Sequence, residues 1–183
     1  MHTPSQHLTT RTGFDFHVRR ARPEDEGTVA EFFTHVTRED LRFRFLTGLS
    51  EVGHAQIVAL THVDHRWSEN FLAFTNDGST MIATAMLACD ATFDHGEVAI
   101  ALSKDYKLHG IGWELLAHVA RFAEAKGVRV LEAIESRENH AAIELERDMG
   151  FTVEPYPGDD SLLLVSRKLM ADGLPPGAYP RPM

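Results

Sequence analysis

One short segment combines the residue types that can hold a phosphate group. Lys107-Leu108-His109-Gly110-Ile111-Gly112 places a cation and two glycines at the start of a helical pattern. The first N–H groups of a helix have no partner within the helix and lie at its positive end, and glycines let a ligand approach the backbone closely. The segment therefore predicts a phosphate seat. A turn that serves packing alone is the alternative that two glycines leave open.

The elements on either side would position this seat. Glu97–Leu102 is a short apolar run of the length of a buried strand. After the glycines, apolar residues recur at helical spacing, and Gly127 ends the pattern as a C-cap residue. The third glycine of a dinucleotide-binding turn is missing, because Glu114 and Leu115 stand at its place. We therefore expect a strand, a glycine turn and a long helix, but not a dinucleotide fold.

Other patterns predict the rest of the chain. Alternating residues at 14–18 indicate a first strand, Pro23 begins a helix, Thr37 is the N-cap of a second helix, and a third is expected over 50–62. Asn76-Asp77-Gly78 is a hairpin turn between strands at 67–76 and 79–91. Further strands are expected at 151–154 and 161–168.

Composition favours a single cytoplasmic domain. At 183 residues, with 43% apolar and 25% charged residues, the chain suits one globular core, over 14–170, between a loose arm at 1–13 and a proline-rich tail at 171–183. It has no apolar run long enough for a membrane span and no secretory signal, and Cys89 is its one cysteine. A net charge of −9 argues against nucleic acid and is compatible with a basic partner or a plain solvated surface.

These motifs resemble those of the GNAT acetyltransferases. The family's acyl-CoA motif is Q/R-x-x-G-x-G/A, and here Lys107 replaces the first residue. The strand at 129–136 and the segment Asn139–Phe151 are similar to the second half of the family's fold. The pieces RPEDEG, TREDLRFRF and HAQIVALTHVD resemble the acetyltransferase domain of bacterial protein lysine acetyltransferases in particular.

The resemblance implies an α/β (α+β) fold, in which helices flank a mixed, mostly antiparallel central sheet. It implies acetyl-CoA as acyl donor and an amine acceptor, most simply a protein lysine, in a monomer or homodimer. The residues that it places around the donor are Leu102, Ser103, Lys107, Leu108, His109, Gly110, Ile111, Gly112, Trp113 and Asn139. Backbone groups at Leu102 and Ser103 would pair with the pantetheine arm and stabilise an oxyanion. Lys107 as a solvated loop residue and Asn139 as a helix N-cap are the plain alternatives.

The resemblance also implies a general base. A lysine amine has a pKa of about 10.4, so it is almost wholly protonated at neutral pH and a base assists its attack. Glu97 begins the strand that leads to the glycine turn, at the place of the family's catalytic glutamate. The family's tyrosine acid follows Leu145, but here that place holds Glu146. Water could protonate the thiolate instead, because a thiol has a pKa of about 8.5.

Three functions stay open at this stage. The first is acetylation of a protein lysine, possibly on an acyl-CoA synthetase. The second is acetylation of a small amine, and the third is a catalytically silent acyl-CoA-binding module, which the missing tyrosine favours. A metal centre is not expected, because His62-Val63-Asp64-His65 has no second group of ligands near it in the sequence.

Overall fold

The computed structural model describes residues 4–49 and 51–169 and folds them around one eight-stranded sheet. The strands are ordered β1-β2-β3-β4-β5-β6-β8-β7. All neighbours are antiparallel except β5 and β6, which are parallel. The bounds are β1 Gln6–Thr9, β2 Asp15–Arg20, β3 Ser68–Thr75, β4 Met81–Cys89, β5 His95–Leu102, β6 Val130–Ser136, β7 Thr152–Pro155 and β8 Leu162–Lys168.

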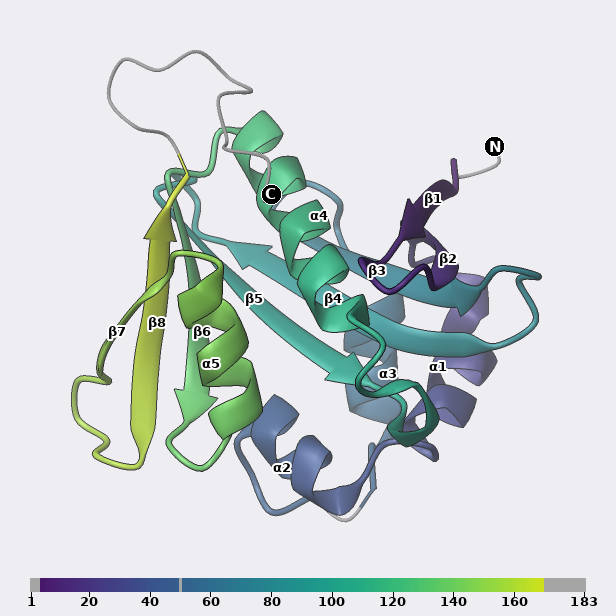
Figure 1. Cartoon of the computed structure of the whole chain (residues 1–183), viewed down its shortest axis with the longest axis horizontal. Coiled ribbons are helices and arrows are strands. Elements are labelled where there is room, and N and C mark those ends of the chain that lie inside the picture. The colour runs from purple at the N-terminus through teal and green to yellow at the C-terminus, as the bar shows by residue number, and fades with distance from the viewer. Residues whose placement is uncertain (1–3, 50, 170–183) are drawn as a thin grey trace.

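Helices cover both faces of the sheet (Figure 1). They are α1 Glu26–Phe33, α2 Arg38–Phe45, α3 His54–Thr61, α4 Ile111–Lys126 and α5 His140–Asp148, with short 3₁₀ turns η1 Pro23–Asp25 and η2 Lys104–Tyr106. One core lies between the sheet and α4, the other between the sheet and α1–α3. Successive side chains of a strand point to opposite faces and so contribute to both cores: Phe71 and Ala73 belong to the first core and Leu72 to the second.

The sheet divides between β5 and β6. Their parallel pairing joins only His95, Gly96 and Glu97 to Val130, Leu131 and Glu132. Beyond that point the two strands part, and β6 continues to pair with β8 along its length. The ribbons of β5 and β6 visibly diverge in Figure 1, with α4 and α5 in front and α2 across the wide end. A backbone edge is thereby left open along the later residues of β5.

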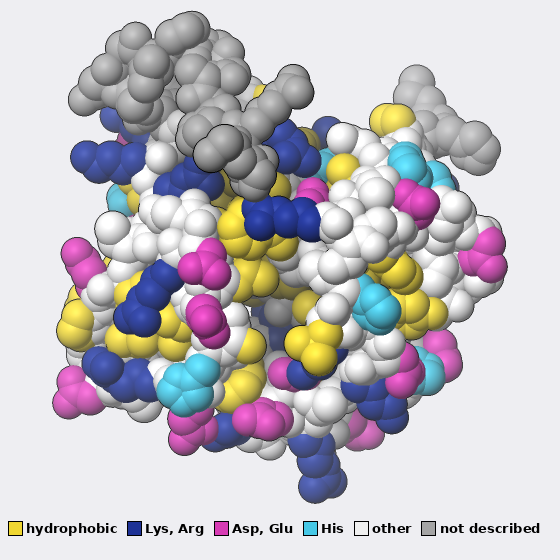
Figure 2. Space-filling model, viewed as in Figure 1, with side chains coloured by type: hydrophobic (Ala, Val, Ile, Leu, Met, Phe, Trp, Pro, Cys, Tyr) yellow, Lys and Arg dark blue, Asp and Glu magenta, His cyan; other side chains and the backbone are white. Residues whose placement is uncertain are grey.

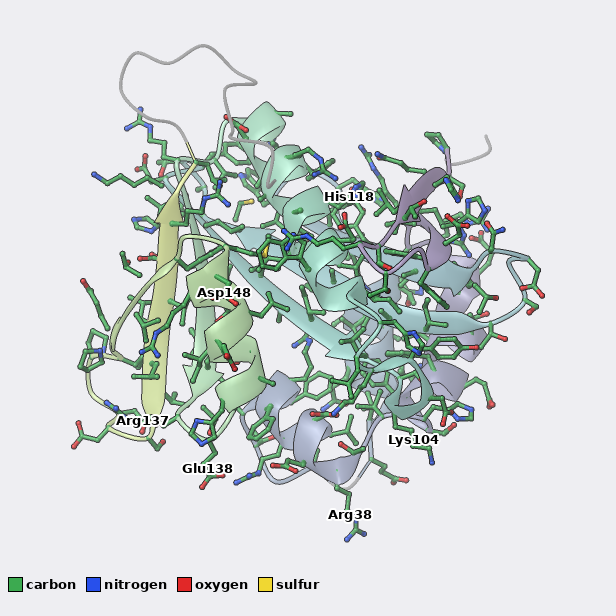
Figure 3. All side chains as sticks on the ribbon, viewed as in Figure 1. Arg38, Lys104, His118, Arg137, Glu138 and Asp148 are labelled. Carbon is green, nitrogen blue, oxygen red and sulfur yellow. The ribbon has the colours of Figure 1, made fainter. Side chains whose placement is uncertain are left out.

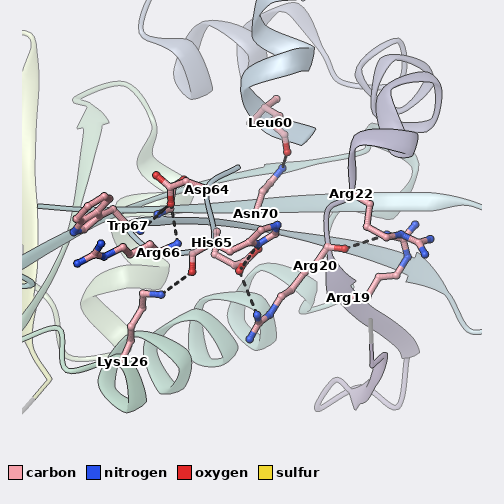
Figure 4. A network of polar contacts seen from close by, with 12 residues as sticks. Arg19, Arg20, Arg22, Leu60, Asp64, His65, Arg66, Trp67, Asn70 and Lys126 are labelled. Atoms are coloured by element: carbon pink, nitrogen blue, oxygen red, sulfur yellow. Dashed lines mark hydrogen bonds and ion pairs between the residues drawn. The ribbon is translucent and has the colours of Figure 1, made fainter. Parts of the chain in front are cut away.

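A polar network ties α3 and the following loop to the sheet. The buried Glu69 carboxylate lies 3.0 Å from His65 Nδ1 and 3.6 Å from an Arg20 nitrogen. Asn70 donates to the Leu60 carbonyl at 2.8 Å, and Figure 4 shows these residues together. His62 Nε2 lies 2.7 Å from a carboxylate oxygen of Glu26, so both histidines that suggested a metal are engaged in protein contacts. Within residues 4–49 and 51–169, no three His, Cys, Asp or Glu side chains are grouped to hold a metal ion.

Three boundaries predicted from the sequence need correction. Part of the expected loose arm, Gln6–Thr9, forms β1, because it pairs in register with β2. The third helix begins at His54, after the N-cap Gly53, and not near Glu51; Ser50 lies outside the described residues. Strand β5 begins at His95 rather than Glu97, since its pairing with β4 extends to Gly96. The proline-rich tail at 171–183 also lies outside the described residues.

Candidate active site

A cleft of about 390 Å³ opens where β5 and β6 part. Its walls come from the later residues of β5, the turn before α4, the first turns of α4 and α5, the end of β6, and α2. In the space-filling view the surface is hollowed near its centre, over this region (Figure 2). Of the residues predicted to form the site, nine line the cleft: Glu97, Leu102, Lys107, Leu108, Gly110, Ile111, Gly112, Trp113 and Asn139.

The glycine turn presents the start of α4 to the cleft. Gly110 is the N-cap and has a φ of 83°, a left-handed conformation that glycine adopts without strain. It offers no side-chain cap, so the first N–H groups of the helix are left for another acceptor. Gly112 is flanked by two leucines: a Cβ there would lie 3.5 Å from Leu145 Cδ1 and 3.6 Å from Leu102 Cδ1. The turn therefore combines a free helix start with close packing.

Lys107 lines the cleft in an ion pair. Its ammonium contacts the carboxylate of Asp40, a residue of the first turn of α2. The sequence suggested that Lys107 is a point charge for a phosphate or a solvated loop residue. Neither prediction included its ion pair with Asp40. The pair ties the glycine turn to α2. On the other side of the cleft, Arg42 of α2 donates to Glu138 at 2.7 Å. Glu138 lies just before α5, as Figure 3 shows. Two ion pairs thus hold α2 across the wide end.

Two predicted residues do not line the cleft. Ser103 is buried; its N–H donates to the Ile82 carbonyl at 2.9 Å, and its hydroxyl accepts from the Asp105 N–H at 3.4 Å. His109 turns toward the N-terminal strands, where its ring lies 5.1 Å from that of Phe14. The sequence could not show the direction of the His109 ring, because β1 and the turn after it were not expected to pack beside the glycine turn.

The Ser103 hydrogen bond identifies the backbone groups that do face the cleft. In an antiparallel pair, successive residues direct their N–H and C=O groups to opposite sides. Since Ser103 bonds to β4, the backbone groups of Leu102 and Ile100 are directed to opposite sides from those of Ser103 and Ala101. They point toward the open edge. A ligand that pairs with β5 would therefore use Leu102 and Ile100, not Ser103.

Glu97 occupies the narrow end of the cleft. It is the last residue of β5 that pairs with β6, and its side chain is exposed. Arg44 of α2 lies close enough for Glu97 to raise its pKa, although burial is the larger effect and lowers the pKa of Arg44 overall. The Nε atom of Arg44 is buried and has no hydrogen-bond partner among the residues that the structure describes. The narrow end therefore combines an accessible acid with a desolvated cation.

A pair of acids lies on the opposite wall. Glu146 of α5 is buried, Glu135 of β6 faces it, and both line the cleft. Asn139 donates to Glu135 at 3.1 Å through its Nδ2 atom. Its Oδ1 atom accepts from the Ala142 N–H at 3.4 Å, as the N-cap prediction requires. Sequence analysis noted Glu146 only as a substitution and missed Glu135, Asp40 and Arg44, since their pairing depends on contacts between distant segments.

Comparison with known proteins identifies the family to which this chain belongs. The model of the acetyltransferase (GNAT) family matches residues 31–151, which is more than half of the chain. The chain belongs to the GNAT acetyltransferase family. It is 26% identical over 152 residues to acetyltransferase PA5475 of Pseudomonas aeruginosa, covering 82% of this chain and 81% of that protein.

Solved structures agree in fold. The GNAT domain of S. lividans PAT superposes with a TM-score of 0.83 at 22% identity, covering 90% of this chain and 96% of that one. A GNAT acetyltransferase from Streptococcus pneumoniae gives 0.67 at 22% identity, over 84% and 98%. A cAMP-binding acyltransferase from Mycobacterium smegmatis gives a TM-score of 0.63 at 22% identity. The match covers 96% of this chain and 51% of that chain.

The expected fold is therefore confirmed, and the chain is an N-acetyltransferase of the GNAT family. The family uses acetyl-CoA as acyl donor. The cleft suits such a donor, because it joins a free helix start at the glycine turn to an open strand edge. No helix in the described part of the chain is long and apolar enough to cross a membrane.

Proposed function

We propose that this chain transfers the acetyl group of acetyl-CoA to the side-chain amine of a protein lysine, with Glu97 as general base. The observation that carries the proposal is the place of Glu97: it lies where β5 and β6 part, at the narrow end of the cleft whose other end is the glycine turn. A donor whose diphosphate rests at that turn, with its pantetheine arm along β5, brings its thioester toward Glu97.

Different residues of the cleft have different roles in this scheme. The free N–H groups at the start of α4 hold the diphosphate, with Lys107 and Trp113 beside them. The backbone of Leu102 and Ile100 pairs with the pantetheine amides. Glu97 accepts the proton that the attacking amine loses, directly or through water, since its carboxylate is exposed. Acetyl transfer needs no covalent enzyme intermediate in this scheme, because the thioester is already activated.

Three features support a lysine on a protein as the acceptor. The segments over α1–α3 resemble those of protein lysine acetyltransferases, and they supply α2, which carries Arg44 near Glu97. The net charge of −9 favours a basic protein surface over an acidic one. The base is also accessible, as attack by a side chain of another protein requires.

The test compares Glu97→Gln with wild type. We expect the variant to bind acetyl-CoA as wild type does and to lose acetyl transfer by ~10²-fold or more, because Gln cannot accept the proton. Glu154→Gln, an exposed strand glutamate on β7, is the matched control and should keep full activity. Binding is followed by Trp113 fluorescence in a Trp67→Phe background and transfer by release of free CoA thiol.

The acceptor is tested with radiolabelled acetyl-CoA. A lysate is compared with a panel of polyamines, amino acids and amine antibiotics. Label on protein lysines supports the proposal, and label on small amines alone contradicts its acceptor. Wild-type transfer rates in Glu97→Gln would contradict the assignment of Glu97 as general base.

A further inference from the structure

The pair formed by Glu135 and Glu146 has no role in the scheme above. Glu146 lies on α5 and is 6% exposed, and its Oε2 atom is buried without a hydrogen-bond partner among the residues described. Both acids nevertheless line the cleft. Glu135 comes from β6 and is held in place by the Asn139 amide at 3.1 Å. Two acids from different elements therefore meet in the wall of the cleft.

The pair holds a proton at neutral pH. Burial, and then the charge and hydrogen bond of Glu135, raise the pKa of Glu146 to about 10. Burial also raises the pKa of Glu135, against the hydrogen bonds from Glu146 and Asn139. Two carboxyl groups that close cannot both ionise in an apolar wall, so they share a proton. A neutral carboxyl group is a proton donor, whereas the exposed Glu97 is suited to be an acceptor.

The position of Glu146 suits one particular step. Leu145, its neighbour on α5, packs beside Gly112 and Leu102. This turn of α5 therefore lies next to the end of β5, along the path from the glycine turn to Glu97. A donor bound as proposed above would carry its sulfur between the diphosphate seat and the general base. Glu146 lines the same cleft from the α5 wall.

We propose that Glu146 is the general acid that protonates the departing CoA sulfur, with Glu135 as the residue that positions and shares the proton. The proposal rests on the acetyl transfer proposed above. The amine nitrogen bonds to the acetyl carbon, and the C–S bond breaks with its electron pair going to sulfur. Glu146 gives its proton to that sulfur, and Glu97 takes one from the nitrogen. The products are an amide and a CoA thiol, and solvent then restores both glutamates.

The two pKa values are matched well enough for this transfer. A free thiol has a pKa of about 8.5. The apolar wall that disfavours a carboxylate disfavours a thiolate too, so the pKa of the leaving thiol rises toward that of Glu146. A donor with a pKa of about 10 is as acidic as a tyrosine, whose pKa is also about 10. Glu146 is therefore suited to the same proton-donating role as a tyrosine.

The test uses Glu146→Gln, which keeps the shape and hydrogen-bonding capacity of the side chain but has no proton to transfer. Glu144→Gln, on the exposed face of the same helix, is the matched control. We expect kcat for CoA release to fall by ~10²-fold in Glu146→Gln. Affinity for acetyl-CoA should stay within about twofold, because the hydrogen-bonding group is retained. Glu144→Gln should match wild type in both.

Two further readouts separate a proton donor from a structural residue. The wild-type kcat should fall at alkaline pH as the pair loses its proton, and Glu146→Gln should lack that limb. The infrared band of a protonated carboxyl group should be present in wild type at pH 8 and lost in Glu146→Gln. Other titratable groups also line the cleft: Asp40, Arg44, Glu97, Tyr106 and Lys107. The pH profiles of Glu144→Gln and Glu97→Gln separate the effects of these groups from that of Glu146.

Each alternative result overturns the proposal in a distinct way. Unchanged kcat and pH profile in Glu146→Gln remove it as the acid. Loss of acetyl-CoA binding in that variant assigns it a structural role. A wild-type spectrum without the carboxyl band shows that the pair is ionised. If wild type releases no CoA with any acceptor, the proposed acetyl transfer itself fails, and the inference fails with it.

Discussion

Replacing Glu146 by Gln should change how the stability of the protein depends on pH. The folded chain raises the pKa of Glu146 from 4.5 to about 10 by burial and by the proximity of Glu135. Between these two values the folded state holds a proton that the unfolded state has lost. The group therefore contributes fully below its unfolded pKa, and its contribution is lost as the pH rises toward the folded value.

The magnitude follows from linkage. One proton changes the free energy of unfolding by about 1.4 kcal/mol per pH unit, so wild type should lose roughly 4 kcal/mol between pH 5 and pH 8 through this group. Gln does not titrate. Relative to wild type, Glu146→Gln should therefore gain roughly that amount of stability over the same interval.

The assay is urea unfolding followed by tryptophan fluorescence at several pH values between 5 and 8. Comparing variant and wild type at each pH cancels the titrating groups that do not contact Glu146. One of these is His118 on α4 (Figure 3), whose pKa is lowered to about 4 by burial and by Arg121 and which acts in the opposite direction, costing stability as pH falls. Glu144→Gln should follow wild type. Equal pH dependence in wild type and Glu146→Gln would refute the reasoning.

Two further predictions concern the phosphate seat. Gly112→Glu should abolish acetyl-CoA binding, measured by Trp113 fluorescence, because it brings a carboxylate and extra bulk between Leu102 and Leu145 at the start of α4; retained affinity would rule out the seat. Asp40→Asn frees Lys107 from its ion pair, so CoA should bind severalfold more tightly at low ionic strength, and the gain should shrink as salt is added, in line with screening over about 10 Å at 0.1 M. Lys107→Gln should have the opposite effect, and a change in the same direction would contradict the assignment.

The cleft shows how a local pattern and a distant contact contribute differently to a site. The glycine turn, the start of α4 and the cap at Asn139 follow from neighbouring residues, and the structure bears out each of these elements. The family resemblance predicts that Leu102 and Ser103 both pair with the pantetheine arm. Pairing with β4 separates them, since the N–H of Ser103 bonds to Ile82 and the backbone of Leu102 is directed the other way.

The sequence by itself determined the features that short-range physics controls: helical and strand periodicity, the caps at Thr37 and Asn139, the hairpin at Asn76-Asp77-Gly78, and the glycine turn. Only the tertiary structure decided that β5 and β6 part after Glu97, that Asp40 pairs with Lys107, and that Glu135 meets Glu146. These contacts join residues that are far apart along the chain. Strand register and helix packing fix their geometry, and burial, which shifts the pKa of the acids, exists only once the whole core has assembled.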